Sequence, residues 1–206
     1  MLSAFFGDGA INQGVIAESL NLASLWDLPI VFIIENNGYS MGTSLERSSS
    51  IQNHLAERAE GFNMQWETVN GSNFYELRAK LHHAMERARH ESKPLLLEID
   101  TYRYYGHSVA DANNKKYRTA EEIEAYKTNH DPIMRWERQL LNEGVITEAA
   151  LKSLDEAAKA EAAASVVFAE ASPWPEPASI FTDIYSEVDQ DSEAGRTGVH
   201  FFSDRV

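Results

Sequence analysis

The start of the chain alternates between apolar runs and polar breaks in the order of a strand, a helix and a strand. An apolar run over 1–6 ends in Gly7-Asp8-Gly9. The run Ile30 to Ile34 is continuous and rich in β-branched residues, which is typical of a strand buried on both faces. Between the two runs, apolar residues recur at helical spacing until Leu28-Pro29, where a helix should stop: Ile11, Val15, Leu22, Leu25 and Trp26. The pattern predicts a βαβ unit with a right-handed crossover.

The middle of the chain continues this alternation after a polar, serine-rich stretch over 43–53. Asn73 followed three residues later by Glu76 forms a capping box, which predicts a helix start. The run Leu95 to Ile99 predicts another buried strand. The expected buried face of the helix comprises Phe74, Leu77, Leu81, Ala84, Met85 and Ala88. We therefore expect an α/β fold in which a parallel sheet carries helices on both faces.

The last third of the chain is predicted to be helical. A loop rich in aromatic and basic residues spans 102–118, and Thr119 with Glu122 forms a second capping box. Asp131-Pro132 should open another helix, and the alanine-rich segment 147–171 one long helix. A proline-rich linker, 172–177, and a tail follow. We expect an α/β domain over 1–145 and, over 146–206, a helical extension, the linker and an acidic tail.

Composition narrows the class of protein. The 206 residues are 43% hydrophobic, which suits a packed core, and the absence of cysteine excludes a disulfide scaffold. A formal net charge of −14 argues against nucleic acid as a partner. No apolar run is long enough for a membrane span and no leader is evident, so we expect a cytoplasmic protein. The acidic segment 155–193 is either a solvated surface or a docking site for a basic partner.

The polar residues that follow the first two strands favour a site for a metal and a diphosphate. Asp8 and Asn37 each come directly after a strand, and one crossover brings both to the same sheet edge. A carboxylate and an amide oxygen suit Mg²⁺, with the carbonyl of Tyr39 as a possible third ligand. Gly9 and Ala10 are small and should stand at a helix N-terminus, which favours a phosphate.

The pairing of Gly7-Asp8-Gly9 with Asn36-Asn37 resembles the thiamine diphosphate motif. The wider sequence resembles the α subunits of the E1 component in the pyruvate and acetoin dehydrogenase family, and the likeness covers most of 3–145. The segments that carry it are Gly7 to Gly14 with Glu18, Asn21 and Ala23, Leu28-Pro29, Glu35 to Thr43, Thr101 to Ser108, Tyr117 to Thr119, and His130 to Met134. The resemblance implies the thiamine-diphosphate-binding fold.

The resemblance also implies roles for individual residues. It assigns Mg²⁺ to Asp8, Asn37 and the Tyr39 carbonyl, and the diphosphate to Gly9 and Ala10. Arg103 and His107 would lie on a loop that closes over the cofactor and touches its phosphates, with His107 as the catalytic candidate. The basic residues of this loop fit that role, although Lys115 and Lys116 are equally well explained as surface contacts: Arg103, Lys115, Lys116 and Arg118. Ser108 matches a regulatory phosphorylation position of mitochondrial relatives.

The implied activity is that of pyruvate dehydrogenase E1, which decarboxylates pyruvate and transfers the acetyl unit to the lipoyl domain of an E2 acyltransferase. In this family a β subunit supplies the activating glutamate, so we expect an α₂β₂ assembly and no activity from the α chain alone. We also expect the chain to lack the family's N-terminal region. Tyr105 stands where many pyruvate-type relatives have histidine, which bears on substrate choice. The alternatives are an acetoin dehydrogenase α subunit, or a truncated chain that acts only as an interaction partner.

Overall fold

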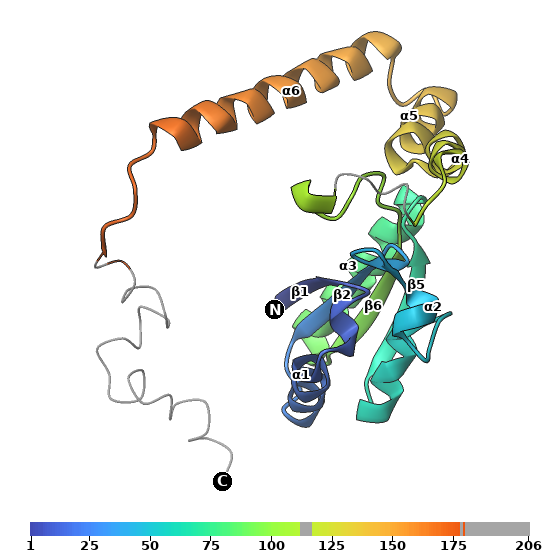
Figure 1. Ribbon diagram of the computed structural model, residues 1–206, viewed down its shortest axis with the longest axis vertical. Coiled ribbons are helices and arrows are strands. Elements are labelled where there is room, and N and C mark those ends of the chain that lie inside the picture. Colours follow the sequence, from blue (N-terminus) through green and yellow to red (C-terminus); the bar gives the residue numbers. More distant parts are fainter. Residues whose placement is uncertain (112–116, 178, 180–206) are drawn as a thin grey trace. The chain divides into compact units, whose positions relative to one another are not determined.

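The structure is a computed structural model that describes residues 1–111, 117–177 and 179 (Figure 1). Short helical turns of the 3₁₀ type are labelled η. The elements in chain order are β1 (Leu2–Gly7), η1 (Ala10–Asn12), α1 (Gly14–Leu25), β2 (Ile30–Asn36), β3 (Tyr39–Ser40), β4 (Thr43–Ser44), α2 (Leu45–Ser48), η2 (Leu55–Phe62), β5 (Gln65–Asn70), α3 (Phe74–Glu91), β6 (Leu95–Asp100), η3 (Val109–Asp111), α4 (Ala120–His130), α5 (Pro132–Asn142) and α6 (Glu148–Ala171).

The centre of the fold is a parallel sheet with the strand order β1-β2-β6-β5 (Figure 1). The register pairs Gly7 with Glu35 and Asn36 with Asp100, so the carboxyl ends of the strands form one edge. The predicted α/β class and the parallel sheet are confirmed. Strand β5 was not expected, because its polar and half-buried residues lack the apolar run of the other strands.

Helices cover both faces of the sheet, as the apolar runs predicted. Phe32 and Ile34 of β2 pack with residues of α1 and η2 in one core cluster. Val31 and Ile33 of the same strand pack with residues of α3 in a second cluster. Alternate residues of one strand therefore enter different cores, which is why β2 reads as a continuous apolar run.

The first helix begins later than the sequence suggested. The chain makes the short turn η1 at Ala10–Asn12, and α1 starts only at Gly14. Gly9 and Ala10 thus stand at the start of a 3₁₀ turn and not at the N-terminus of the α-helix. Three of the apolar residues that suggested the helix are exposed: Val15, Leu22 and Leu25. Two apolar residues of the edge strand β1, Leu2 and Phe5, are exposed as well.

Three expected helix caps are present. The Asn73 side chain accepts a hydrogen bond from Glu76 N (3.3 Å) at the start of α3. Thr119 Oγ1 accepts one from Glu122 N (3.0 Å) at the start of α4. Asp131 Oδ1 accepts hydrogen bonds from the first backbone amides of α5, where proline takes the first helical position. Local sequence therefore fixes where these helices begin.

The chain divides into two compact units, Met1–Glu148 and Ala149–Val206. In the second unit the described structure is mainly α6, whose side chains are largely exposed. The end of α6 at Ala171, before the proline-rich segment, agrees with the prediction. The acidic tail beyond residue 179 lies outside the described residues. No helix in the described ranges has both the length and the apolar character needed to cross a membrane.

Candidate functional site

The ends of β1 and β2 bring Asp8 and Asn37 into contact. Asp8 follows the last residue of β1 and Asn37 follows the last residue of β2. The backbone N–H of Asn37 donates to Asp8 Oδ1 at 3.3 Å, and the Asn37 side-chain Nδ2 donates to the same oxygen at 3.2 Å. The expected proximity of these two residues is therefore present, and it follows from the parallel register of the two strands.

The Asp8 carboxylate is buried, and one of its oxygens lacks a partner. The residue is 1% exposed, and Oδ2 makes no hydrogen bond to any part of the chain that the structure describes. Burial raises the pKa of Asp8 above its ordinary value, against the opposing effects of the Asn37 backbone N–H and of the positive charges of Arg103 and Arg118. An unpaired buried carboxylate oxygen is costly, and a cation would satisfy it. The donor set of one carboxylate with neutral oxygens nearby fits Mg²⁺.

Such a metal site would contain a single charged ligand. Within residues 1–111, 117–177 and 179 no group of three or more histidine, aspartate or glutamate side chains is placed to hold a metal. Zinc sites are built from histidine, cysteine and carboxylate ligands, whereas Mg²⁺ usually takes one or two carboxylates and completes its shell with phosphate and water. The arrangement at Asp8 therefore favours Mg²⁺ over zinc.

A buried polar chain that sequence reasoning missed supports the turn after β2. Asn36 Nδ2 donates to Glu98 Oε1 at 2.7 Å, and Glu98 Oε2 accepts from Ala56 N at 3.1 Å. Asn36 Oδ1 accepts from Gly38 N at 2.9 Å and so closes the turn. Glu98 is 3% exposed in the centre of the sheet. In the sequence, the one sign of this polar chain is that Glu98 interrupts the apolar run of β6.

Strand β3, which follows the turn after β2, lies directly against Gly9. A Cβ on Gly9 would stand 2.3 Å from Ser40 Oγ, so only glycine permits this approach. Gly38 has φ +78°, a conformation that favours glycine, and the turn leads into Tyr39. Glycine at position 9 is thus explained by its contact with Ser40 of β3, independently of any phosphate. The ligand roles of Gly9, Ala10 and the Tyr39 carbonyl stay predictions.

Arg103 and His107 of the aromatic loop lie together. Arg103 Nη1 is 3.2 Å from His107 Nδ1, and Arg103 Nη2 donates to the Met41 carbonyl at 2.6 Å. The backbone N–H of His107 donates to Asp111 Oδ2 (2.9 Å), and Tyr117 OH donates to the same oxygen (2.5 Å). The Tyr117 hydrogen bond is the main reason that the pKa of Asp111 is lowered. The predicted pair is therefore present in one network, whereas Lys115 and Lys116 lie outside the described residues.

Arg118 has a different position from the one expected of a basic loop residue. It is 2% exposed, and its guanidinium donates to the carbonyl oxygen of Asn37 at 3.0 Å. The same group lies 4.4 Å from the ring centroid of Tyr39 and 4.6 Å from that of Tyr102. Burial, with a hydrogen bond to Glu122, raises the pKa of Tyr102 to about 12, so this ring is neutral at physiological pH. Arg118 thus contacts the candidate site from within the protein.

Comparison with known proteins identifies the family of this chain. The family model described as "Dehydrogenase E1 component" matches residues 1–178. The α subunit of the pyruvate dehydrogenase E1 component from Rickettsia bellii is 43% identical over 181 residues, which cover 88% of this chain and 54% of the relative. The corresponding subunit from Rhizobium meliloti is 40% identical, with 88% and 51% covered. The α subunit of acetoin:2,6-dichlorophenolindophenol oxidoreductase from Cupriavidus necator is 38% identical, with 88% and 54% covered.

The chain thus spans about half the length of the curated relatives that it matches. The matched part includes both strand ends that carry Asp8 and Asn37, the turn after β2 and the loop that carries Arg103 and His107. The match to the family model covers most of the chain and agrees with the resemblance carried by the glycine and asparagine motifs. The chain belongs to the dehydrogenase E1 component family.

Proposed function

We propose that this chain is the cofactor-binding part of a pyruvate dehydrogenase E1 α subunit. The whole enzyme would decarboxylate pyruvate with thiamine diphosphate and Mg²⁺ and transfer the acetyl unit to the lipoyl group of an E2 acyltransferase. The observation that carries the proposal is the buried, unpaired Oδ2 of Asp8 beside Asn37 at the ends of two parallel strands. The names of the relatives support pyruvate as the substrate.

Asp8 and Asn37 would hold Mg²⁺, with the Tyr39 carbonyl as a third ligand. The positive charge of the metal would remove the cost of burying the Asp8 carboxylate, which explains why an unpaired oxygen is kept there. Gly9 and Ala10 would line the diphosphate next to this metal. When bound, thiamine diphosphate supplies the electron sink for decarboxylation of a 2-oxo acid.

His107 and Arg103 would bind the phosphates from the loop side. Because a guanidinium can only donate, His107 Nδ1 must accept the Arg103 hydrogen bond at 3.2 Å. The proton of a neutral His107 ring is then on Nε2, which becomes a donor for an anionic oxygen. Arg103 contributes a positive charge whose effect reaches Asp8. This donor and this charge are the contribution we propose for the loop.

The working enzyme would need further chains. We propose an α₂β₂ assembly in which the E1 β subunit completes the active site, and a lipoyl domain of E2 as the acceptor. The small-molecule substrate would be a 2-oxo acid. Turnover by the 206-residue chain alone is not expected.

The second candidate function is that of an acetoin dehydrogenase α subunit. It is favoured by the Cupriavidus necator relative, which is 38% identical over the same share of this chain. Tyr105, at a position where many pyruvate-type relatives have histidine, is 77% exposed on the loop. A third possibility, a chain that binds partners but no cofactor, predicts no binding of thiamine diphosphate at all.

The proposal is tested by calorimetric titration of thiamine diphosphate, with and without Mg²⁺, into the chain co-purified with its β subunit. The Asp8→Ala variant should lose binding, whereas Glu35→Ala, which removes an exposed carboxylate at the end of β2, should retain it. Assays with pyruvate and with acetoin then separate the two enzymes. Equal binding by wild type and Asp8→Ala would refute the proposed site, and no binding by a folded complex would favour the interaction partner.

A further inference from the structure

Arg118 is a fully buried arginine in a very acidic chain, and it lies immediately before the cap of α4. Its guanidinium is enclosed by tyrosine rings from two separate segments. The ring centroids of Tyr39 and Tyr102 lie 4.4 and 4.6 Å from Arg118 Cζ, and that of Tyr117 lies 5.8 Å away. Desolvated cation–π contacts of this kind are favourable and restrict the orientation of the guanidinium plane.

The hydrogen bonds of this guanidinium converge on Asn37. Arg118 Nη2 donates to the backbone carbonyl of Asn37 at 3.0 Å and to its side-chain Oδ1 at 3.3 Å. Arg118 Nη1 donates to the carbonyl of Arg103. One side chain therefore holds both the backbone and the amide of Asn37, and it ties them to the beginning of the aromatic loop.

These contacts decide which way the Asn37 amide faces. Arginine has only donors, so the amide oxygen must face Arg118 and the NH₂ group must face the other way. The NH₂ group is then directed at Asp8 Oδ1, to which it donates at 3.2 Å. Consequently Oδ1 of Asp8 is occupied, and Oδ2 is left as the unpaired buried oxygen.

We infer that Arg118 is a positioning residue for the Asp8–Asn37 site, acting through Asn37. It fixes the Asn37 carbonyl and amide and so sets which oxygens remain for a cation. One lone pair of Asn37 Oδ1 accepts from Arg118, and the second remains for a metal. The consequence for metal binding rests on the proposed function, whereas the effect of Arg118 on the conformation of Asn37 does not.

Two substitutions separate the shape of the guanidinium from its charge. Arg118→Met removes the charge and all the donors, and Arg118→Lys keeps the charge but loses the planar fork that reaches Asn37 and Arg103 together. Arg138→Met is the matched control, because it removes an exposed arginine from α5.

The first measurement is backbone hydrogen exchange of the full chain without metal. Arg118→Met and Arg118→Lys should exchange faster in the segment 37–44, with unchanged protection in β2 and β6, and Arg138→Met should match the wild type. The second is the Mn²⁺ affinity of the chain co-purified with its β subunit, in the presence of thiamine diphosphate. Loss of an outer-shell partner should weaken it by roughly 10- to 100-fold in both Arg118 variants.

The results distinguish this inference from the proposed function. Unchanged exchange over 37–44 in Arg118→Met would overturn the inference, and so would faster exchange spread evenly over the whole sheet. Wild-type Mn²⁺ affinity in Arg118→Met would overturn it as well. A wild-type chain, co-purified with its β subunit, that binds no Mn²⁺ would refute the proposed metal site, and the exchange data would still decide whether Arg118 orients Asn37.

Discussion

Replacing Asp8 by asparagine should make the metal-free chain more stable. The substitution keeps an oxygen that accepts from the Asn37 N–H groups at 3.3 and 3.2 Å, and it removes the negative charge at the buried Oδ2 position. Burial raises the pKa of Asp8 despite the opposing hydrogen bonds and positive charges, so the folded environment disfavours the charged form on balance. A residue kept for metal binding would then cost stability when no metal is bound.

The size of the effect follows from the unpaired oxygen. A buried acceptor without a partner costs about 1–3 kcal/mol, and more if it is charged. The NH₂ group of the new asparagine would also lack a partner. The gain in stability is therefore only the difference in burial cost between a charged and a neutral unpaired group. We expect a gain of about 1 kcal/mol, at the lower end of that range. For a chain of this size, 1 kcal/mol corresponds to a rise in Tm of about 2–4 °C.

The assay is thermal unfolding of wild type and Asp8→Asn in the presence of a chelator, at neutral pH and at successively lower pH. Because the folded-state pKa lies above the ordinary value of 3.8, the penalty on the wild type is absent below that value and present once the pH exceeds the folded-state pKa. The advantage of Asp8→Asn should therefore shrink as the pH falls. An Asp8→Asn variant with an equal or lower Tm at neutral pH would refute the reasoning, as would an advantage that grows on acidification.

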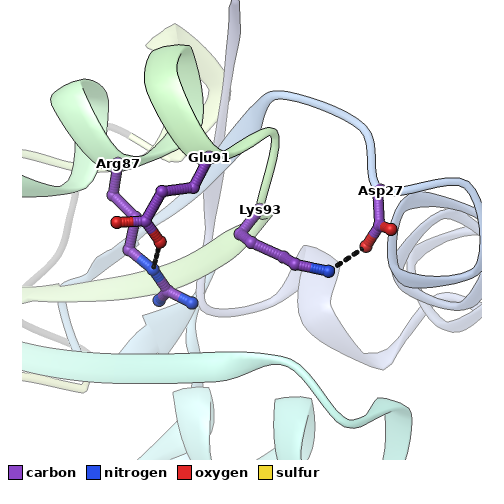
Figure 2. Close-up of polar contacts among 4 residues, drawn as sticks. All are labelled: Asp27, Arg87, Glu91 and Lys93. Atoms are coloured by element: carbon purple, nitrogen blue, oxygen red, sulfur yellow. Dashed lines mark hydrogen bonds and ion pairs between the residues drawn. The ribbon is translucent and has the colours of Figure 1, made fainter.

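Three further predictions concern contacts around the site and at the surface. Glu98→Leu should leave two buried donors unpaired, Asn36 Nδ2 and Ala56 N, and lower the free energy of unfolding by about 1–3 kcal/mol for each. Urea denaturation measures this, and an unchanged midpoint would contradict it. Thr119→Ala should cost about 1 kcal/mol by removing the cap of α4, whereas Thr119→Ser should retain most of it; equal losses in both would show that the hydroxyl does not matter. Lys93→Met breaks the exposed ion pair with Asp27 that is drawn in Figure 2 (2.5 Å). The free energy of unfolding should change by less than about 1 kcal/mol, and the difference from wild type should vanish in 1 M salt. A larger change that persists in salt would contradict this.

Much of the fold could be predicted from local sequence. The continuous apolar runs identified β2 and β6, because a strand that is buried on both faces needs apolar residues at every position. The capping residues Asn73 and Thr119 located two helix starts, because their side chains satisfy backbone amides only a few residues away. The edge strand β5 escaped prediction, since its mixture of polar and half-buried residues carries no clear period.

The contact between Asp8 and Asn37 was predictable for a related reason. Each residue follows a predicted strand, and the crossover of a βαβ unit brings the ends of its two strands to one edge. The reason for glycine at position 9 was not predictable in the same way. Gly9 is required by Ser40 of the distant strand β3, and the helical pattern gives no sign of that contact.

The sequence by itself therefore determined the fold class, the apolar strands β2 and β6, and the proximity of two polar residues at a sheet edge, because these depend on local periodicity and on the rules of parallel connection. Only the tertiary structure decided the electrostatics of the site. The burial of Asp8, the support from Glu98 and the role of Arg118 depend on packing between distant segments; Arg118 and Asn37 are 81 residues apart. The sequence does not distinguish a basic loop residue that is exposed to solvent from one that is buried among tyrosine rings. Only the packing of the folded chain shows that Arg118 is the second kind.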